Sequence, residues 1–413
     1  MNKANYKNSI VNLSNSILSH FGAEPFHNTI PEVDKFLEDK KKVVLFLFDG
    51  MGRYVIEKHL PENSFLRRHT FHYMTSTFPP TTVAATNGLL SGKFPSETGW
   101  LGWSQYFEGI DKTVKMFSNK DDETGDKIPG PHLGNTYCGY EKITDIINRV
   151  NNKKMADMTQ GTAVDTTHYW NRHLKAFIKH NYKLVNELGD ESFVYAYWTD
   201  PDHEMHGEGV TAKSVHKIIL KINKYIEKFS QKNPDVTTLV IADHGLIDVK
   251  NIDIWKDKEI QDCLLRNISL EGRCANFFIK PDKKEEFANI FREKYGEHYN
   301  LYTKEEVIEM GLFGDTKPNE FVSKFIGDYV GIATDGYMLK KEEDPFSHKA
   351  HHAGSTLDEL IISIIGVSSQ TATPSKAFTP LPRAVLSRMM EAAATSRVSS
   401  GCMKASPSLL MNR

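Results

Sequence analysis

The sequence predicts an α/β fold in which a mostly parallel sheet is flanked by helices and interrupted by inserted cap segments. Three apolar runs have the length and composition of buried strands, at 43–48, 193–198 and 238–242. Each of these runs breaks off at a turn that contains aspartate. A helical pattern over about 214–229 joins the second run to the third, which favours a βαβ connection and a parallel pair.

The three strand-ending aspartates are the first candidate site residues. They are Asp49, Asp202 and Asp243. In open α/β sheets, ligands bind outside the carboxyl ends of the strands, so we expect the three side chains to share one crevice. Carboxylates there, joined by nearby imidazoles, suit hard or borderline divalent cations. The sequence therefore predicts a metal site at this edge of the sheet.

Composition and charge exclude several classes of protein. The chain has 413 residues, of which 39% are hydrophobic and 25% charged, with a net charge of −2. These are globular values, and they predict neither a nucleic-acid nor a membrane partner. No run approaches the roughly 18 apolar residues that span a bilayer, and the N-terminal segment lacks a signal-peptide core. The four cysteines include no C-x-x-C pair, so we expect reduced thiols. We also expect a soluble cytoplasmic protein. The sequence does not indicate its oligomeric state.

The elements before and after the first run follow from periodicity. An amphipathic helix is expected over about 8–20, another from near residue 52, and a third over 82–90, which Pro79-Pro80-Thr81 opens. The stretch from about 100 to 191 is polar and irregular, which indicates an insertion or lid.

A second insertion is expected over about 250–344, and it has elements of its own. Strands at 275–280 and 329–333 alternate with helices at 284–295 and 305–310, which predicts a small α+β cap. We therefore assign 1–366 to one domain with two insertions. Residues 367–413 hold six Lys or Arg against one acidic residue and are rich in Ser, Ala, Thr and Pro, which indicates a disordered or non-native tail.

Histidines supply the other candidate ligands. Asp202 and His206 stand four residues apart, so one helical turn brings them to a single ion, and His206 is preferred to His203. His244 follows Asp243 directly, and on a turn the two side chains serve one ion or straddle two. The pair His351-His352 follows the second insertion, and one of these two histidines is expected to be the sixth metal ligand.

Taken together, these residues predict two divalent ions and a nucleophile. Four positive charges against three carboxylates leave about +1, which attracts an anion, and a two-metal clamp suits displacement at phosphorus. The hydroxyls of Thr81 and Thr82 stand at a predicted helix N-terminus, where the helix dipole and a metal stabilise an alkoxide. Each feature alone has a structural explanation, such as helix capping by either threonine. The order in which they occur together carries the prediction.

That order resembles the alkaline phosphatase superfamily and, within it, the type I phosphodiesterase/nucleotide pyrophosphatase branch. The resemblance covers roughly 43–366. It rests on five blocks of sequence: Leu47-Phe48-Asp49-Gly50-Met51, Phe78-Pro79-Pro80-Thr81-Thr82 running to Leu90-Ser91-Gly92, Asp202-x-x-x-His206, Asp243-His244-Gly245 and His352-Ala353-Gly354. It implies an alkaline-phosphatase-like fold, with a mostly parallel sheet and inserted caps.

The resemblance also implies roles for these residues. Thr82 corresponds to the nucleophile, because the family's nucleophile stands ten residues before the glycine matched by Gly92. The resemblance implies that this residue also contacts a metal. His351 is the alternative to His352. One zinc-like ion is bound by Asp49, Asp243 and His244, and the other by Asp202, His206 and His352.

Two departures from the family pattern concern specificity and the last ligand. Where the diesterase branch usually has an asparagine that binds a phosphate oxygen, this chain has tryptophan, in Gly99-Trp100-Leu101-Gly102-Trp103. Trp100 and Trp103 either stack on a base or pack beneath the insertion. Ala353 replaces a glycine that is common in the family.

The resemblance implies a two-metal-dependent hydrolase of small-molecule phosphate esters, a phosphodiesterase or nucleotide pyrophosphatase that acts through a covalent phospho-threonine. Zinc is the expected metal, with manganese as an alternative. A phosphomonoesterase or phosphomutase of the same superfamily is the alternative reaction. A non-enzymatic binding protein that retains the scaffold is the third hypothesis.

Overall fold

A computed structural model describes residues 1–162, 168–343 and 347–369. These residues belong to a single compact unit. The last strand of the chain that it describes, β17 (Ile361–Val367), ends one residue after the predicted end of the catalytic domain. Most of the predicted tail, at 370–413, lies outside the described residues.

The central sheet has six strands in the order β2-β17-β8-β1-β7-β6. The neighbours β8, β1, β7 and β6 are parallel, whereas β17 runs antiparallel to both β8 and β2. The predicted mostly parallel α/β sheet is therefore confirmed. Its strands, in chain order, are β1 (Lys42–Phe48), β2 (Thr70–Thr75), β6 (Ala156–Gly161), β7 (Ser192–Trp198), β8 (Thr237–Ile241) and β17.

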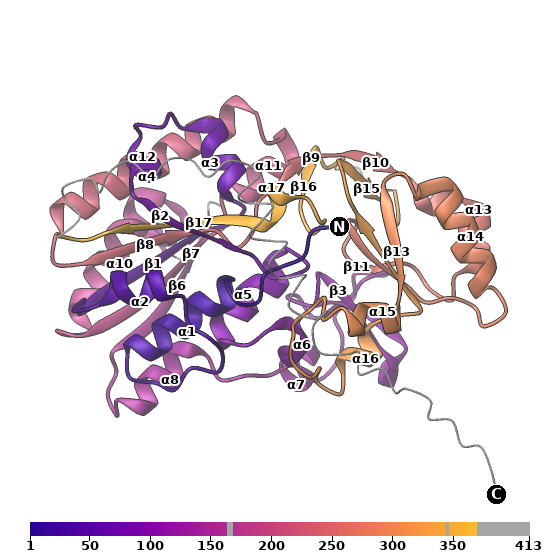
Figure 1. Cartoon of the computed structure of the whole chain (residues 1–413), viewed down its shortest axis with the longest axis horizontal. Helices are drawn as coiled ribbons and strands as arrows, with labels where there is room; N and C mark the ends of the chain where they lie inside the picture. Colours follow the sequence, from indigo (N-terminus) through magenta and orange to yellow (C-terminus); the bar gives the residue numbers. More distant parts are fainter. Residues whose placement is uncertain (163–167, 344–346, 370–413) are drawn as a thin grey trace, which may run out of the picture. The chain divides into compact units, whose positions relative to one another are not determined.

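Strand β1 lies in the interior of this sheet. All six residues from Val43 to Phe48 are buried, which explains why the sequence shows a continuous apolar run instead of alternation. Such a strand needs cover on both faces, and in Figure 1 the strands lie between α12 (Lys213–Lys232) with α4 (Phe65–Arg68) and α1 (Ile10–His20) with α8 (Ile143–Val150).

The connection from β7 to β8 differs from the prediction in one respect. The two strands are parallel and α12 joins them, but they do not pair, because β1 lies between them. Leu47 of β1 is in register with Tyr197 of β7 on one side and with Ile241 of β8 on the other. The 20-residue α12 is long enough to cross over β1. Sequence pattern indicates parallel strands, but it does not indicate which strand is inserted between them.

The stretch 100–191 is not one irregular insertion. Its first part forms β3 (Ser104–Phe107), β4 (Lys112–Lys115) and β5 (Lys120–Asp121), which pair with the second insertion. Its later part returns to the central sheet as β6 and is followed by the 14-residue helix α10 (Leu174–Glu187). Strand β6 is at the sheet edge and reads Ala-Asp-Met-Thr-Gln-Gly, with only partial burial. An edge strand needs no apolar run, so the sequence pattern missed it.

The predicted cap is the larger part of a seven-stranded antiparallel sheet in the order β13-β14-β12-β11-β3-β4-β5. Helix α14 (Lys284–Tyr295) and strand β14 (Tyr329–Ala333) have the predicted bounds. Helix α15 (Lys304–Glu309) begins one residue earlier than predicted, and β12 (Cys274–Phe277) is shorter. The other strands of the cap region are β9 (Ile247–Asp248), β10 (Lys250–Ile252), β11 (Ser269–Leu270), β13 (Tyr299–Thr303), β15 (Tyr337–Leu339) and β16 (Ala350–His351).

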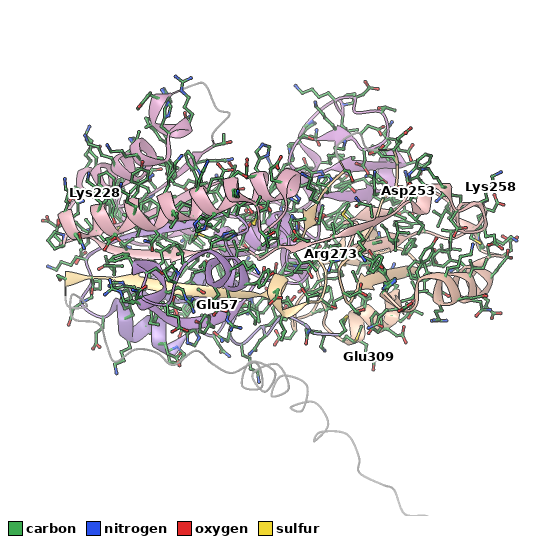
Figure 2. The ribbon with its side chains drawn as sticks, turned by 90° about the horizontal axis from the view of Figure 1, so that it is seen from above. Glu57, Lys228, Asp253, Lys258, Arg273 and Glu309 are labelled. Atoms are coloured by element: carbon green, nitrogen blue, oxygen red, sulfur yellow. The ribbon has the colours of Figure 1, made fainter. Side chains whose placement is uncertain are left out.

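Charged side chains lie mainly at the periphery. Figure 2 shows Lys228 of α12, Lys258 at the start of α13 (Lys258–Cys263) and Glu309 at the end of α15 on the outside of the molecule. Arg273, in contrast, lies in the interior, and it is fully buried. A buried guanidinium needs a charged partner, and the partner of Arg273 is Glu359. This pair connects the cap to the candidate site.

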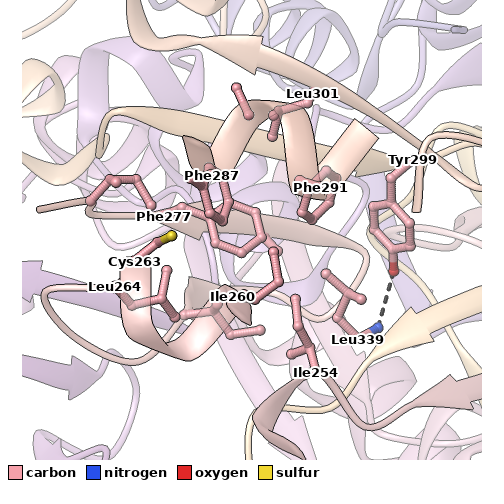
Figure 3. Packing of buried hydrophobic residues seen from close by; sticks show 14 of the residues in the cluster. Ile254, Ile260, Cys263, Leu264, Phe277, Phe287, Phe291, Tyr299, Leu301 and Leu339 are labelled. Carbon is pink, nitrogen blue, oxygen red and sulfur yellow. Dashed lines mark hydrogen bonds between the residues drawn. The ribbon is translucent and has the colours of Figure 1, made fainter. Parts of the chain in front are cut away.

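The cap has a hydrophobic core of its own. In Figure 3, Phe287 and Phe291 from one face of α14 pack against Phe277 of β12 and against Ile260 of α13. Tyr299 lies at the border of this core, where its hydroxyl accepts a hydrogen bond from the backbone N–H of Leu339 at 3.0 Å. The cap that contains this core also presents residues to the candidate site.

Helices α3 (Arg53–His59) and α5 (Thr82–Ser91) lie where the sequence predicts them, whereas several shorter helices were not predicted. Helix α1 begins two residues later than predicted. In the part of the chain that the structure describes, no helix combines the length and the apolar character needed to cross a bilayer. Cys138, Cys263 and Cys274 are buried and unpaired, as predicted, while the cytoplasmic location stays a prediction. The other helices are α2 (Pro31–Leu37), α3 (Arg53–His59), α5 (Thr82–Ser91), α6 (Pro95–Thr98), α7 (Leu133–Tyr137), α9 (Tyr169–Arg172), α11 (Asp202–Glu208), α16 (Val322–Phe325) and α17 (Leu357–Leu360).

Candidate metal centre

The three predicted aspartates meet at the carboxyl edge of the central sheet. Asp49 directly follows β1, Asp243 follows β8, and Asp202 opens α11 after β7. The backbone N–H of Asp49 donates to the carbonyl of Trp198 at 2.9 Å, and that of Asp202 donates to the carbonyl of Asp49 at 3.0 Å. The parallel register of the sheet therefore brings the three carboxylates into one crevice.

Gly50 makes this close approach possible. Its φ of 71° lies in the left-handed region, and a Cβ atom there would lie 2.9 Å from the Cβ of Asp202. Its backbone N–H donates to Oδ1 of Asp243 at 3.0 Å. The Asp-Gly turn after β1 is thus required both by backbone conformation and by the packing of three carboxylates.

One group of possible ligands consists of Asp49, Asp243 and His244, the three residues predicted to bind the first ion. Nε2 of His244 lies 3.3 Å from Oδ1 of Asp49 and 3.5 Å from Oδ2 of Asp243. The backbone N–H groups of Gly50 and His244 both donate to Oδ1 of Asp243, so this carboxylate is fixed in orientation. One potential ligand atom from each of the three residues lies within 4.8 Å of the others.

The second predicted set is also close together, but its geometry is less regular. Nε2 of His206 lies 3.2 Å from Oδ2 of Asp202, and Nε2 of His352 lies 3.9 Å from Oδ1 of Asp202. Asp202 and His352 also group with His244 within 4.8 Å. His206 groups instead with His351, the predicted alternative to His352, and with His348, which was not predicted as a ligand.

Burial gives the three carboxylates unequal acidity. Burial raises the pKa of Asp49 well above its usual value, and the charges of Asp243 and Asp202 raise it further. Burial also raises the pKa of Asp243. Burial also acts to raise the pKa of Asp202, but the neighbouring imidazoles of His206, His244 and His351 together outweigh it and hold this pKa below its usual value. Carboxylates that repel one another in a buried crevice are stabilised by a cation.

Several polar atoms at this site have the character of open ligand positions. Oδ1 of Asp202, Oδ2 of Asp243 and Nδ1 of His352 are buried without a hydrogen-bond partner. Such atoms are costly in a folded protein unless something else satisfies them. Carboxylate oxygens and imidazole nitrogens of this kind fit divalent zinc or manganese, so the donor set agrees with the predicted cofactor.

The two candidate threonines point to different partners. Thr82, the first residue of α5, places Oγ1 at 3.1 Å from Nε2 of His244 and at 3.4 Å from each carboxylate oxygen of Asp49. Thr81, the N-cap residue, is fully buried and donates its hydroxyl to Oε1 of Glu271 at 2.6 Å. Of the two threonine hydroxyls, that of Thr82 faces the ligand groups.

The loop that carries His352 explains the final motif. Ala353 has a φ of 81°, in the left-handed region that favours glycine, so the glycine common in the family has a conformational reason here. The N–H of Ala353 donates to the carbonyl of Pro80 at 3.0 Å, which holds this loop against the start of α5. His351, the alternative ligand, lies in β16 and faces His206 at a ring distance of 4.8 Å.

Two residues at the site were missed by the sequence analysis. The hydroxyl of Tyr197 in β7 donates a short hydrogen bond to Oδ2 of Asp49. Glu271, which is buried, accepts hydrogen bonds from Thr81 and from the backbone N–H of Trp103 at 3.0 Å. Glu271 lies 190 residues from Thr81 in the sequence, and no local pattern indicates that the cap delivers it here. Tyr197 gave no signal beyond its place in an apolar strand.

A cavity of about 430 Å³ opens beside Thr82, Asp202, His206 and His352. Trp103, which is 48% exposed, lines it together with cap residues around β11 and β15. Trp100 is only 4% exposed and donates its indole N–H to the carbonyl of Cys138 at 2.8 Å. Of the two tryptophans, Trp100 packs beneath the insertion and Trp103 is available to a ligand.

Comparison with solved structures supports the fold. A structure of mouse ectonucleotide pyrophosphatase / phosphodiesterase 5 aligns with a TM-score of 0.57 at 15% identity, covering 79% of this chain and 88% of the mouse chain. The human protein gives 0.57 at 16% identity, with coverage of 79% and 88%. An inactive mouse variant, with threonine replaced by alanine and in complex with AMP, gives 0.56 at 14% identity, with coverage of 80% and 88%. At these identities the likeness concerns the fold alone.

Family membership rests on a match along the sequence. No curated protein matches the chain. The family model for type I phosphodiesterase / nucleotide pyrophosphatase, however, matches residues 43–355, well over half of the chain and including every predicted site residue. The chain therefore belongs to the type I phosphodiesterase / nucleotide pyrophosphatase family of the alkaline phosphatase superfamily, and it is a hydrolase of phosphoric esters.

Proposed function

We propose that this protein is a two-metal-dependent phosphodiesterase or nucleotide pyrophosphatase in which Thr82 is the nucleophile. The observation that carries the proposal is the direction of the Thr82 hydroxyl, which lies 3.1 Å from Nε2 of His244 and faces Asp49. The neighbouring Thr81 is engaged with Glu271 and cannot take this role without breaking a buried hydrogen bond.

Two groups of residues would hold the metals. Asp49, Asp243 and His244 would bind the ion next to Thr82, and Asp202, His206 and His352 would bind the other. When bound, two divalent ions would lower the pKa of the Thr82 hydroxyl, so that its proton passes to solvent, and would offset the charge of the phosphoryl oxygens. Zinc suits this mixed set of carboxylates and imidazoles, and manganese is the alternative.

The chain's own groups orient the reaction. Oγ1 of Thr82 attacks phosphorus, a bond forms between them, and the bond from phosphorus to the leaving ester oxygen breaks. Water then attacks the same phosphorus, the bond from phosphorus to Oγ1 breaks, and a proton from the water passes to Oγ1 to restore the Thr82 hydroxyl. The position of Thr82 at the start of the ten-residue helix α5 adds the helix dipole to the stabilisation of negative charge. Tyr197 holds the Asp49 carboxylate in place throughout.

We propose a nucleotide-containing phosphodiester as the substrate class. The mouse relative binds AMP in its inactive threonine-to-alanine form, which supports a nucleotide at a site of this fold. In this chain, Trp103 lines the cavity beside Thr82 and offers an aromatic face to a base. A phosphomonoesterase or phosphomutase would use the same nucleophile. The tryptophan in place of the family's asparagine is the reason to compare these reactions directly.

The proposal is tested by turnover of bis-p-nitrophenyl phosphate and p-nitrophenyl phosphate after loading with zinc or manganese. We expect preference for the diester and its loss by at least about 10³-fold in Thr82→Ala. Thr81→Ala is the matched control, since it removes the adjacent hydroxyl and leaves the nucleophile. Wild-type turnover by Thr82→Ala would contradict the mechanism, and preference for the monoester would favour the phosphatase.

A further inference from the structure

A third group of possible metal ligands lies beside the two proposed ions. His206, His348 and His351 each offer a ring nitrogen, and these three atoms lie within 4.8 Å of one another. The ring centroids are 5.2 Å apart for His206 and His348, 5.3 Å for His348 and His351, and 4.8 Å for His206 and His351. All three side chains line the cavity that opens beside Thr82.

Different elements bring these histidines together. His206 lies on α11, and His351 lies in the short strand β16, where it is in register with Ile247 of β9. His348 precedes β16 in the chain. Nδ1 of His206 lies 2.9 Å from the carbonyl oxygen of Ala350, a geometry in which Nδ1 carries the proton. Nε2 of His206 is therefore the nitrogen available to a cation.

His206 also belongs to the second proposed ion. Its Nε2 lies 3.2 Å from Oδ2 of Asp202, and one nitrogen lone pair binds one metal. The imidazole can therefore complete the set with Asp202 and His352 or the set with His348 and His351, but not both at once. The two sets compete for a single ligand.

The chemistry of the three-histidine group differs from that of the catalytic sets. It consists only of imidazoles, which suit zinc, copper and nickel, whereas manganese prefers carboxylate and water oxygens. Among the described residues, this group itself includes no carboxylate to offset the charge of an ion placed beside two others. A cation should therefore bind there more weakly than at the aspartate-containing sets, and only if it is of the zinc type.

We propose that His206, His348 and His351 form a third, inhibitory cation site, at which excess zinc withdraws His206 from the second catalytic ion. This inference rests on the proposed function, because inhibition presupposes that Asp202, His206 and His352 hold a catalytic ion. Zinc would then activate the enzyme at low concentration and inhibit it at high concentration. Manganese would activate it without the inhibitory phase.

The test is metal content and activity of the full chain in buffered free zinc, from limiting to excess. We expect the wild type to reach two ions per chain at low zinc and to bind a further ion as its activity falls. His348→Ala should not bind this further ion and should keep its own maximal activity at high zinc. His203→Ala is the matched control, because His203 lines the same cavity but belongs to none of the ligand groups found among the described residues.

The outcomes separate the two proposals. Saturation of the wild type at two zinc ions, or inhibition that His348→Ala retains, would overturn the third site while leaving the catalytic site intact. Inhibition of the wild type by excess manganese equal to that by zinc would also overturn it, and this measurement does not depend on any variant. A zinc ion lost only in His348→Ala, in a protein without activity towards either ester, would support the third site and contradict the proposed function.

Discussion

Arg273 and Glu359 form a fully buried, two-pronged ion pair that connects the cap to the loop carrying His352. Nε and one terminal nitrogen of Arg273 lie 2.7 and 2.8 Å from the two carboxylate oxygens of Glu359, and both side chains are 0% exposed. Glu359 in turn accepts the backbone N–H of Gly354 at 2.7 Å and the hydroxyl of Thr356 at 2.7 Å. Any side chain at Gly354 would clash with the guanidinium.

Removing one partner of this pair leaves the other charge buried and uncompensated. We expect Glu359→Ala to lower the free energy of unfolding by about 3–5 kcal/mol, measured by urea unfolding of the metal-free protein. The matched control is the double variant Arg273→Met, Glu359→Leu, which removes both charges and should recover much of the loss. A loss below about 1 kcal/mol in Glu359→Ala would contradict the buried pairing.

Tyr197 should influence metal affinity without binding metal. Its hydroxyl donates to Asp49, and partners of this kind orient a ligand and typically change affinity by about 10–100-fold. Tyr197→Phe should weaken binding of the ion next to Thr82 to that extent, as measured by competition with a zinc chelator. Tyr182→Phe is the control. The hydroxyl of Tyr182 lies 2.6 Å from Oγ1 of Thr238 and forms a hydrogen bond with it, and neither residue belongs to the site. Equal zinc affinity in both variants would show that the Tyr197 hydroxyl does not influence metal binding.

Glu271 should make stability depend on pH in the metal-free protein. Burial raises the pKa of Glu271 to about 7, from an ordinary value of 4.5. The folded state therefore keeps a proton that the unfolded chain releases. The contribution of Glu271 to the free energy of unfolding is fully present below about pH 4.5 and is lost as pH rises through 7.

The variant Glu271→Gln cannot lose this proton. Relative to the wild type, its free energy of unfolding should rise by about 3 kcal/mol between pH 4 and pH 8. The measurement is urea unfolding at both pH values in the presence of a chelator. Parallel pH profiles for the two proteins would show that Glu271 titrates normally.

Trp103 should contribute to substrate binding more than to chemistry. Stacking of a base on an aromatic side chain is worth about 1–3 kcal/mol, so Trp103→Ala should raise KM for a nucleotide ester about 5–100-fold with little change in kcat. Thymidine 5′-p-nitrophenyl phosphate compared with methyl p-nitrophenyl phosphate measures the effect, which should be absent for the methyl ester. Phe117→Ala is the control, since Phe117 contacts Trp103 edge-on and does not line the cavity. An unchanged KM of Trp103→Ala for the nucleotide ester would show that the base does not stack on Trp103.

Features that depend on local order along the chain could be predicted from the sequence. The buried strand β1 is a continuous apolar run because it is covered on both faces, and each aspartate follows its strand because a turn must begin there. Parallel strands bring such turns to one edge, so Asp49, Asp202 and Asp243 could be predicted to meet.

Other features could not be predicted, because they depend on pairing between distant segments. β1 is inserted between β7 and β8, and strands from 104–121 join those from 269–333 in one cap sheet. The cap delivers Glu271 to Thr81, which leaves Thr82 facing the ligand groups. His206 lies between two sets of ligands for the same reason, since α11 and β16 are adjacent in space and far apart in sequence. Side-chain periodicity reports the burial of a segment but carries no information about its partner.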